Sequence, residues 1–269
     1  MKIRSKLIYA IFCLLIIQSG CSKEQQKVQE PVSSEVKKNE IALTKEKQSN
    51  LTIDEIIQQF KDGNERFLKE VTIRHDYHNQ IEQTGSQGQF PKAIVLSCID
   101  SRAPAEVIFD KGIGDIFGTR VAGNYADEGV IGGIEYACKV AGAKVIIVLG
   151  HSDCGAVKSA CDNVKLGNIT YVMDEIKPAV DSVKGFDGDR TSKNKEFVKD
   201  VTIKNVQLTM KKILADSEIL SELAKGDKIK VIGAVYDVMT GKVEFLTSRF
   251  LFTYYLILYI KNLIILIYL

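Results

Sequence analysis

The chain has 269 residues and a formal net charge of +2, with 36 Lys and Arg against 34 Asp and Glu. This length is enough for one domain of roughly 200 residues with a full hydrophobic core and further segments at its ends. Because the sequence has no basic block with interleaved aromatic residues, we expect no nucleic-acid partner.

Residues 1–21 have the layout of a secretory signal. Basic residues near the N-terminus precede an apolar run over 7–17, as in signal peptides. Gly20 and Cys21 follow, and this ending resembles a bacterial lipoprotein signal, in which Cys21 is lipidated and becomes the mature N-terminus. Gln18 stands three residues before Cys21, where lipoprotein signals usually have leucine. An ordinary signal peptide or an uncleaved anchor therefore stays open. We expect an exported lipoprotein, anchored by lipid to a membrane and facing the periplasm or the cell exterior.

Residues 22–50 are rich in Lys, Glu, Gln and Ser and contain almost no large apolar residue. Such a segment cannot bury enough surface to order itself. We therefore predict a disordered tether over 22–50 and the folded domain over 51–247.

The C-terminal tail, 248–269, has a different composition from the rest of the chain. From Phe250 onward it is almost wholly apolar and long enough to cross a bilayer. Lys261 near its middle would cost about 3 kcal/mol on insertion scales. A membrane segment and an aberrant C-terminus both stay open for this tail.

Helices and strands are expected to alternate within 51–247. Thr52-Ile-Asp-Glu55 is a capping box followed by apolar residues at helical spacing, which predicts a helix over 52–70. A polar, Gln- and Gly-rich stretch follows, to Phe90. The remaining pattern predicts strands over 93–96, 115–121, 144–149, 228–236 and 243–246, and helices over 104–110, 128–140, 154–161, 171–183 and 197–224.

This alternation predicts an α/β fold with a central, mostly parallel β-sheet: about four parallel strands and a short edge strand, flanked by helices, with an N-terminal helical arm. Ligands of such sheets collect beyond the carboxyl ends of the strands. Cys98 and His151 follow the first and third strands. These strands would be neighbours if the second strand lies on the far side of the first, and both residues would then lie in one place.

Cys98-Ile-Asp-Ser-Arg102 and His151-Ser-Asp-Cys154 contain the side chains expected of a catalytic zinc site. Two cysteines and one histidine are a ligand set that leaves a fourth position open. Soft N and S ligands favour Zn²⁺ over magnesium or calcium. Cys154 would begin a helix, where backbone N–H groups favour the thiolate. We therefore predict one Zn²⁺ bound by Cys98, His151 and Cys154.

Two roles stay open for Asp100. It could be the fourth metal ligand and close the site, or it could accept a hydrogen bond from metal-bound water. Arg102, two residues later, can bind Asp100 through two hydrogen bonds and keep it away from the metal. Asp100 is therefore a candidate metal ligand, and Asp100 and Arg102 together form a candidate catalytic dyad.

Other interpretations compete for some of these residues. A disulfide between Cys98 and Cys154 is an alternative in an exported protein. We interpret Cys138 and Cys161 as small buried hydrophobes. His75 and His78 lie in the polar stretch and are expected to be solvated, although His78 stays open as a proton shuttle.

Several segments together resemble the β-class carbonic anhydrases. The match runs in order from about Thr52 to Leu246, and the segments that make it are Gly63-Asn-Glu-Arg-Phe67, Gly88-Gln-Phe-Pro91, Ser97-Cys-Ile-Asp-Ser-Arg102, Arg120-Val-Ala-Gly-Asn124, Glu135-Tyr-Ala137, Gly150-His-Ser-Asp-Cys-Gly-Ala-Val157 and Tyr236-Asp-Val-Met-Thr-Gly241.

The resemblance implies a zinc lyase that reversibly hydrates carbon dioxide to bicarbonate and a proton, by attack of zinc-bound hydroxide. It implies that Gln89 hydrogen-bonds substrate from a partner subunit, and that the chain forms a homodimer or a dimer of dimers embraced by the helix over 52–70. The relatives with a bicarbonate regulatory site use a tryptophan there, and this chain has none. A hydrolase of carbon disulfide or carbonyl sulfide on the same zinc, or a non-catalytic zinc-binding envelope protein, stays open as an alternative.

Overall fold

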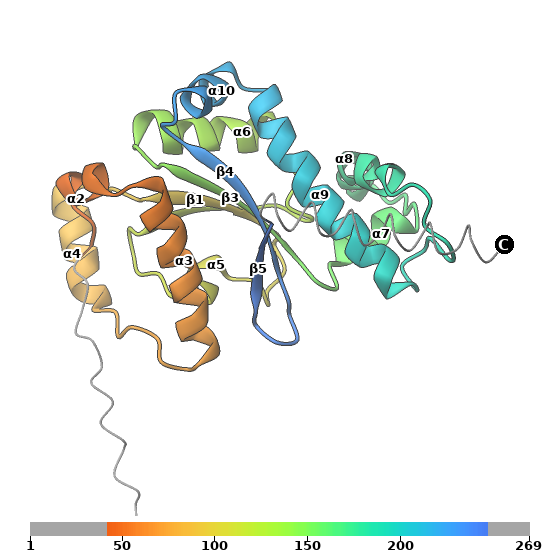
Figure 1. The fold of residues 1–269 in the computed structure, drawn as a ribbon, viewed down its shortest axis with the longest axis horizontal. Helices are drawn as coiled ribbons and strands as arrows, with labels where there is room; N and C mark the ends of the chain where they lie inside the picture. The colour runs from red at the N-terminus through yellow and green to blue at the C-terminus, as the bar shows by residue number, and fades with distance from the viewer. Residues whose placement is uncertain (1–41, 247–269) are drawn as a thin grey trace, which may run out of the picture. The chain divides into compact units, whose positions relative to one another are not determined.

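The structure is a computed structural model that describes residues 42–246. Its core is one five-stranded sheet with the strand order β2-β1-β3-β4-β5 (Figure 1). The first four strands are parallel, and β5 is antiparallel at the edge. The predicted α/β fold is therefore confirmed, with its second strand on the far side of the first. The strands are β1 (Ala93–Ser97), β2 (Ile116–Arg120), β3 (Val145–His151), β4 (Lys230–Tyr236) and β5 (Val243–Leu246).

The two central strands, β1 and β3, are buried along their whole length. Successive side chains of a strand point to opposite faces of the sheet. On β1, Ile94 and Leu96 pack into one apolar cluster, whereas Ala93 and Val95 pack into another. A parallel sheet with both faces covered requires such continuous apolar runs.

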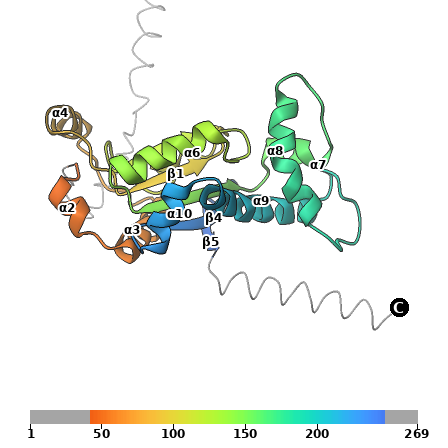
Figure 2. The same ribbon diagram turned by 90° about the horizontal axis from the view of Figure 1, so that it is seen from above.

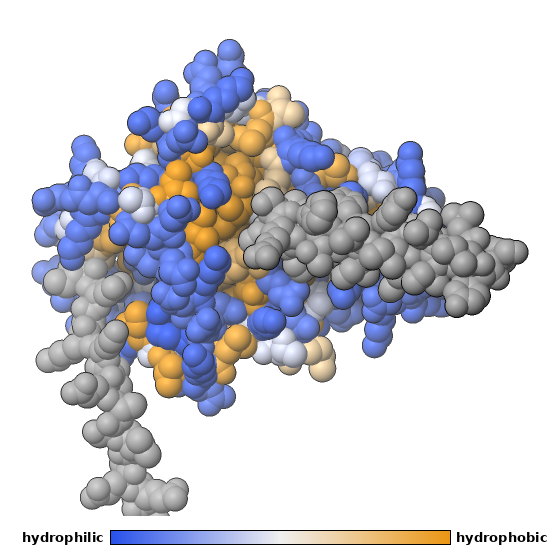
Figure 3. Space-filling model, in the orientation of Figure 1, coloured by the Kyte–Doolittle hydropathy of each residue, from blue (hydrophilic) through white to orange (hydrophobic). Residues whose placement is uncertain are grey.

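Helices cover both faces of the sheet (Figure 1). Residues of α6, the π-helix η1, α9 and α10 join one apolar cluster, and residues of α3 and α5 join the other. These helices are α3 (Ile53–Leu68), α5 (Ala105–Ile108), α6 (Glu128–Glu135), η1 (Tyr136–Val140), α9 (Lys195–Ala215) and α10 (Glu218–Lys225). In Figure 3 apolar residues gather over the middle of the visible face, with hydrophilic residues around them.

A third apolar cluster contains Cys98 and Cys154 together with residues of α7 (Gly155–Cys161), α8 (Ile169–Ser182) and the first turns of α9. Figures 1 and 2 both show α7 and α8 at the end of the domain that lies away from α2 (Lys45–Asn50) and α4 (Tyr77–Gln87). The predicted zinc ligands therefore lie beside their own packed cluster of helices.

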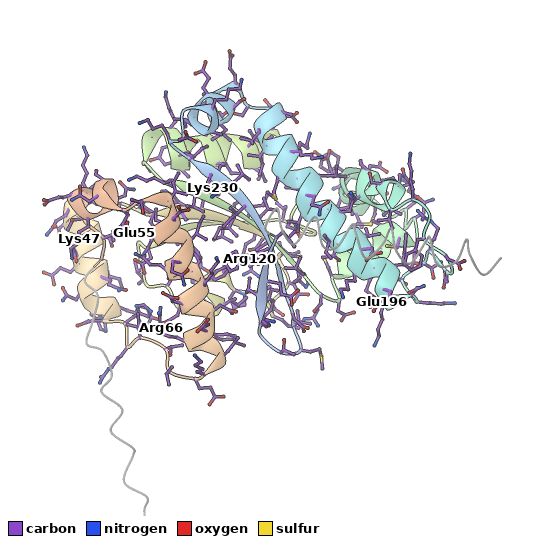
Figure 4. The ribbon with its side chains drawn as sticks, in the orientation of Figure 1. Lys47, Glu55, Arg66, Arg120, Glu196 and Lys230 are labelled. Carbon is purple, nitrogen blue, oxygen red and sulfur yellow. The ribbon has the colours of Figure 1, made fainter. Side chains whose placement is uncertain are left out.

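The capping box at the start of α3 is confirmed. Thr52 Oγ1 accepts a hydrogen bond from the Glu55 N–H at 3.3 Å, and the Thr52 N–H donates to Glu55 Oε2 at 2.8 Å. Figure 4 shows Glu55 at this end of the helix. The box satisfies two backbone N–H groups that the first turn of a helix leaves unpaired.

The predicted extent of the tether, to residue 50, is wrong. Lys45–Asn50 forms helix α2, and Gln48 is only 5% exposed. Its amide Nε2 donates to Pro91 O at 2.7 Å and to Ala141 O at 2.9 Å. These polar contacts order a segment that lacks apolar residues. The predicted segments 1–21 and 248–269, and the tether up to residue 41, lie outside the described residues.

Helix α4 occupies the stretch for which only a polar segment was predicted. Asp76 caps it, and Gln80, 2% exposed, accepts a hydrogen bond from the Ile113 N–H at 3.0 Å. Because a polar side chain anchors this helix, the apolar spacing that identifies helices is missing. The prediction that His75 is solvated is also wrong: its side chain is 7% exposed and lies 3.4 Å from Asp110.

The long helix predicted over 197–224 is two helices, α9 and α10. Ser217 separates them, because its hydroxyl accepts a hydrogen bond from the Leu220 N–H at 3.1 Å and caps α10. The helix predicted over 128–140 changes to π geometry at Tyr136. In the part of the chain that the structure describes, no helix has the length and apolar character needed to cross a membrane.

Candidate metal centre

Cys98, His151 and Cys154 come together as the sequence predicted. Their Sγ and ring nitrogen atoms all lie within 4.8 Å of one another. The three residues are 4%, 1% and 1% exposed. A buried cluster of two sulfurs and one imidazole has the donors and the spacing to bind one metal ion.

The sheet brings these residues together. β1 and β3 are parallel neighbours with Ser97 opposite Leu149, so the chain reaches Cys98 and His151 at the same edge. The loop after His151 is attached to β4, because the Ser152 N–H donates to Tyr236 O at 2.8 Å. Cys154 then occupies the N-cap position of α7. The loop thus places Cys154 Sγ next to Cys98 Sγ.

The donor set fits zinc. Two sulfurs about 2.3 Å from a tetrahedral zinc would be about 3.8 Å apart, and the Sγ atoms of Cys98 and Cys154 are 3.9 Å apart. His151 Nδ1 faces Ser152 O at 2.9 Å, so the ring proton belongs on Nδ1. His151 Nε2 is buried with no hydrogen-bond partner among the described residues. A metal would satisfy this nitrogen.

The contact between the two sulfurs shifts the pKa values of Cys98 and Cys154 in opposite directions. The neighbouring Cys154 thiol holds the pKa of Cys98 well below its usual range, and the Gly123 N–H donates to the same sulfur at 3.3 Å. The pKa of Cys154 is raised by its contact with Cys98 and by burial. Both cysteines are free, so the alternative of a disulfide between them is wrong. Binding of a divalent cation would require both cysteines as thiolates.

Asp100 lies beside this cluster and is bound by Arg102. Arg102 Nε donates to Asp100 Oδ1 at 2.9 Å, and Arg102 Nη2 donates to Asp100 Oδ2 at 2.8 Å. Asp100 Oδ2 is 3.8 Å from His151 Nε2. The guanidinium holds the pKa of Asp100 well below its usual range. Asp100 is thus an ionised carboxylate next to the metal site, with both oxygens bonded to arginine.

Two charged residues that were not predicted to act here also support the site. Arg120, at the end of β2 and labelled in Figure 4, is the first of them. It donates from Nε to Cys98 O at 3.0 Å and from Nη2 to Asp100 O at 2.6 Å. Asp153 accepts from Lys158 at 2.9 Å and lies 3.5 Å from Arg102. Their only signal in the sequence is their place inside two of the quoted segments.

Gln89 lies away from the cluster of its own chain. It is exposed and lines a cavity of about 550 Å³ together with Gln48 and Lys144. Lys144 directly precedes β3 and Gln89 precedes β1, so this is the amino edge of the sheet. Cys98 and His151 lie at the carboxyl edge. Cys21, the predicted lipidation site, lies outside the described residues.

Among the described residues, two further cysteines lie apart from the metal cluster, in apolar surroundings. Cys138 is buried in the cluster formed by α6, η1 and the sheet, and Cys161 packs partly buried against the cluster around α8. Burial raises the pKa of Cys138 to about 12. Neither thiol is therefore poised for reaction.

Comparison with known proteins points to one family. A family model described as carbonic anhydrase matches residues 93–243. Carbonic anhydrase 2 of Mycobacterium tuberculosis is 36% identical over 185 residues, which cover 68% of this chain and 87% of that protein. A carbonic anhydrase of Mycolicibacterium smegmatis is 34% identical over 187 residues, covering 68% and 88%.

Solved structures share the fold. One structure from a study of two tetrameric β-carbonic anhydrases of Sordaria macrospora superposes with a TM-score of 0.55 at 24% identity, covering 64% of this chain and 88% of that chain. A β-carbonic anhydrase of Aspergillus fumigatus gives 0.55 at 23% identity, covering 71% and 88%. With the sequence matches, these likenesses identify the family, and the chain belongs to it as an enzyme of the β-class carbonic anhydrases.

Proposed function

We propose that this enzyme catalyses the reversible hydration of carbon dioxide to bicarbonate and a proton on one Zn²⁺ bound by Cys98, His151 and Cys154. The main support for this function is the buried Cys-His-Cys cluster with the arginine-bound carboxylate of Asp100 beside it. A zinc ion in this site would supply a Lewis acid that lowers the pKa of coordinated water to about 7.

The residues around the cluster would keep one coordination position available. Arg102 binds both oxygens of Asp100, so the carboxylate is directed to the guanidinium rather than to the three ligands. An ionised carboxylate in this place can accept a hydrogen bond from the nucleophile and orient it. Asp153 accepts a hydrogen bond from Arg102 Nη1, and the Arg102 backbone N–H donates to Asp100 Oδ1. We therefore assign Asp100 and Arg102 as a dyad in which the arginine keeps the carboxylate off the metal, so that the fourth coordination position stays available.

Stopped-flow measurement of proton release on mixing with carbon dioxide tests this function. The zinc-loaded protein should hydrate carbon dioxide at pH 8 and above, and Cys98→Ser should abolish both metal binding and activity. Cys138→Ala is the matched control, because Cys138 is equally buried but packs in a different cluster. A zinc-loaded protein without activity at this pH would refute the proposal.

We also propose that the functional unit is a homodimer joined through β2. Within residues 42–246, β2 has a strand partner on one side only. Phe117 of β2 lies beside Tyr136 and Val140, which are 56% and 68% exposed, and all three line the cavity that contains Gln89. An unpaired strand edge with apolar residues beside it is a site for pairing with a second copy.

Two-fold symmetry would make this dimer complete the active site. Two copies of β2 related by a two-fold axis across the sheet pair antiparallel. The amino edge of one sheet then lies beside the carboxyl edge of the other. Gln89 of one protomer would approach the Cys98 site of its partner, in the role of a substrate hydrogen-bond donor. The tetrameric relatives from Sordaria macrospora support a dimer of such dimers.

The N-terminal sequence supports export and lipid anchoring at Cys21. The basic start, the apolar run and Gly20-Cys21 are the basis of this proposal. Membrane fractions of cells that produce the full chain should contain the enzyme, and mass spectrometry should find Cys21 acylated. Cys21→Ser should release the enzyme from the membrane. An N-terminus at any other residue would refute lipidation.

A further inference from the structure

A tight turn of backbone lies against the sulfur of Cys98. The Asn124 N–H donates to Val121 O at 3.0 Å and closes the turn, and Gly123 has a φ of +82°. This is the third position of a type II turn, which favours glycine. The Gly123 N–H is the group that donates to Cys98 Sγ. The turn thus places one backbone donor on a predicted metal ligand.

Packing fixes where this turn can lie. A Cβ atom on Gly123 would be 2.4 Å from Ile176 Cδ1 of α8 and 3.2 Å from Ala156 Cβ of α7. Gly123 is therefore pressed against two helices as well as against Cys98. A displacement of the turn by a few tenths of an ångström would change the contact with the sulfur.

Asn205 of α9 attaches to the same turn from another direction. Its side-chain Nδ2 donates to Gly123 O at 2.7 Å, across 82 positions of sequence. Asn205 is 3% exposed, and its helix is 21 residues long and packs on the sheet through Ile203 and Val206. Gly123 thus donates to the metal ligand through its N–H and accepts from Asn205 through its carbonyl oxygen.

We propose that Asn205 is a positioning residue of the metal centre: its hydrogen bond to Gly123 O holds the turn so that the Gly123 N–H stays directed at Cys98 Sγ. An N–H donor withdraws charge from a thiolate and makes it a weaker electron donor to the metal. The effect of Asn205 on the metal is therefore electronic as well as structural. The inference rests on the metal site proposed above.

The neighbouring buried residue Thr202 provides the contrast. It is also 3% exposed and lies on the same helix, but its hydroxyl donates to Val198 O within α9, at 2.8 Å. Thr202→Val thus removes a buried polar group of α9 that is not bonded to the turn. Asn205→Leu removes a buried polar group that is bonded to the turn, and it keeps the number of side-chain heavy atoms.

The experiment compares these variants in the full chain, loaded with Co²⁺ or Zn²⁺. For Asn205→Leu we expect the thiolate-to-cobalt charge-transfer band to move to lower energy, because the sulfur loses a well-directed donor. We also expect about a 10-fold loss of zinc affinity in a chelator competition, the low end for loss of an outer-shell partner, because the loosened turn no longer holds Cys98 in its position and this outweighs the stronger electron donation by the sulfur. Thr202→Val should match the wild type in both measurements.

The outcomes separate the inference from the function on which it rests. If the wild type binds no metal, the proposed function fails. If the wild type binds metal and Asn205→Leu gives the same band energy and zinc affinity as Thr202→Val, the inference is overturned and Asn205 only stabilises the fold. If Asn205→Leu does not fold, Asn205→Ser, whose hydroxyl is too short to replace the amide, is judged by the same two measurements.

Discussion

Arg102 binds both carboxylate oxygens of Asp100, with hydrogen bonds of 2.9 Å and 2.8 Å. A guanidinium presents two parallel N–H donors in a rigid plane, which an ammonium cannot do. The arrangement depends on Asp100 being ionised, and Arg102 lowers the pKa of this carboxyl. A depressed folded-state pKa means that the pair contributes stability above the unfolded pKa of about 3.9, and loses it only as the pH falls below that value.

Arg102→Lys should therefore lower the hydration rate with little loss of metal. Lysine keeps the positive charge but cannot make both hydrogen bonds to the Asp100 carboxylate. Asp100 is then free to turn toward the metal. We expect kcat/KM to fall roughly 10- to 100-fold, with one zinc retained per chain by elemental analysis. Arg74→Lys, at an exposed position, is the control. Wild-type turnover in Arg102→Lys would show that the two-point contact is dispensable.

Arg120 should be needed for metal affinity rather than for catalysis itself. Its two hydrogen bonds attach the carbonyl oxygens of Cys98 and Asp100 to the end of β2. Arg120→Met keeps much of the side-chain volume and removes both bonds. We expect weaker zinc binding in a chelator titration, and recovery of most of the activity when zinc is in excess. Unchanged affinity would mean that the strand ends alone position Cys98.

The ligand set could be predicted from sequence because Cys98 and His151 lie at the ends of two apolar strands, Cys154 lies three residues after His151, and parallel strands end at one edge. Arg120, Asp153 and Asn205 could not be predicted in the same way. They act on backbone atoms or on charges that become neighbours only in the folded chain, such as Gly123 O, which lies 82 positions before Asn205. No local spacing encodes such a contact.

The same limit applies to the fold. The apolar runs identified all five strands, and the capping box identified the start of α3. Helices α2 and α4 were missed because Gln48 and Gln80 anchor them through single buried amides. Amides of this kind look the same in a sequence as amides in a disordered segment.

Lys111 gives a stability prediction with a defined pH range. Burial lowers its pKa to about 8 from 10.5, and nearby Lys92 adds to the shift. Below pH 8 the charged amine is buried at a cost. Between pH 8 and 10.5 the unfolded chain binds a proton that the folded chain does not, so stability rises with pH. This lowering of the Lys111 pKa corresponds to about 3 kcal/mol of stability gained over that pH range.

Lys111→Met should remove this pH dependence. In urea unfolding, the stability of the variant relative to the wild type should decrease by about 3 kcal/mol as the pH rises from 7.5 to 10.5. Lys47→Met, at an exposed position, should show a constant difference over the same range. Parallel curves for Lys111→Met and the wild type would contradict a depressed pKa at Lys111.

The capping box of α3 should contribute measurably to stability. Thr52→Ala removes the acceptor for the Glu55 N–H and leaves that group to solvent. The expected loss in the free energy of unfolding is about 1 kcal/mol. Thr72→Ala, at an exposed position outside the helices, is the comparison. Equal stability of the two variants would show that α3 is held by its apolar face alone.

Mixed dimers test whether Gln89 acts on the partner's site. Gln89→Leu removes the proposed substrate contact, and Cys98→Ser removes the metal, so each homodimer should be impaired. In a dimer with one chain of each kind, the Gln89→Leu chain still has its metal ligands, and the Cys98→Ser chain still has Gln89. If Gln89 acts across the interface, this dimer contains one complete site.

Differently tagged chains, unfolded and refolded together, would supply the mixed dimer for a stopped-flow assay. Action across the interface should restore about half of the wild-type rate per dimer, since one of two sites is complete. Action within one chain leaves both sites defective, and the rate should stay at that of the impaired homodimers. Gln89 and Cys98 lie at opposite edges of the sheet of one chain, which favours action across the interface. A mixed dimer without restored activity would refute the proposed interface. It would show that Gln89 of one chain does not act at the metal site of its partner.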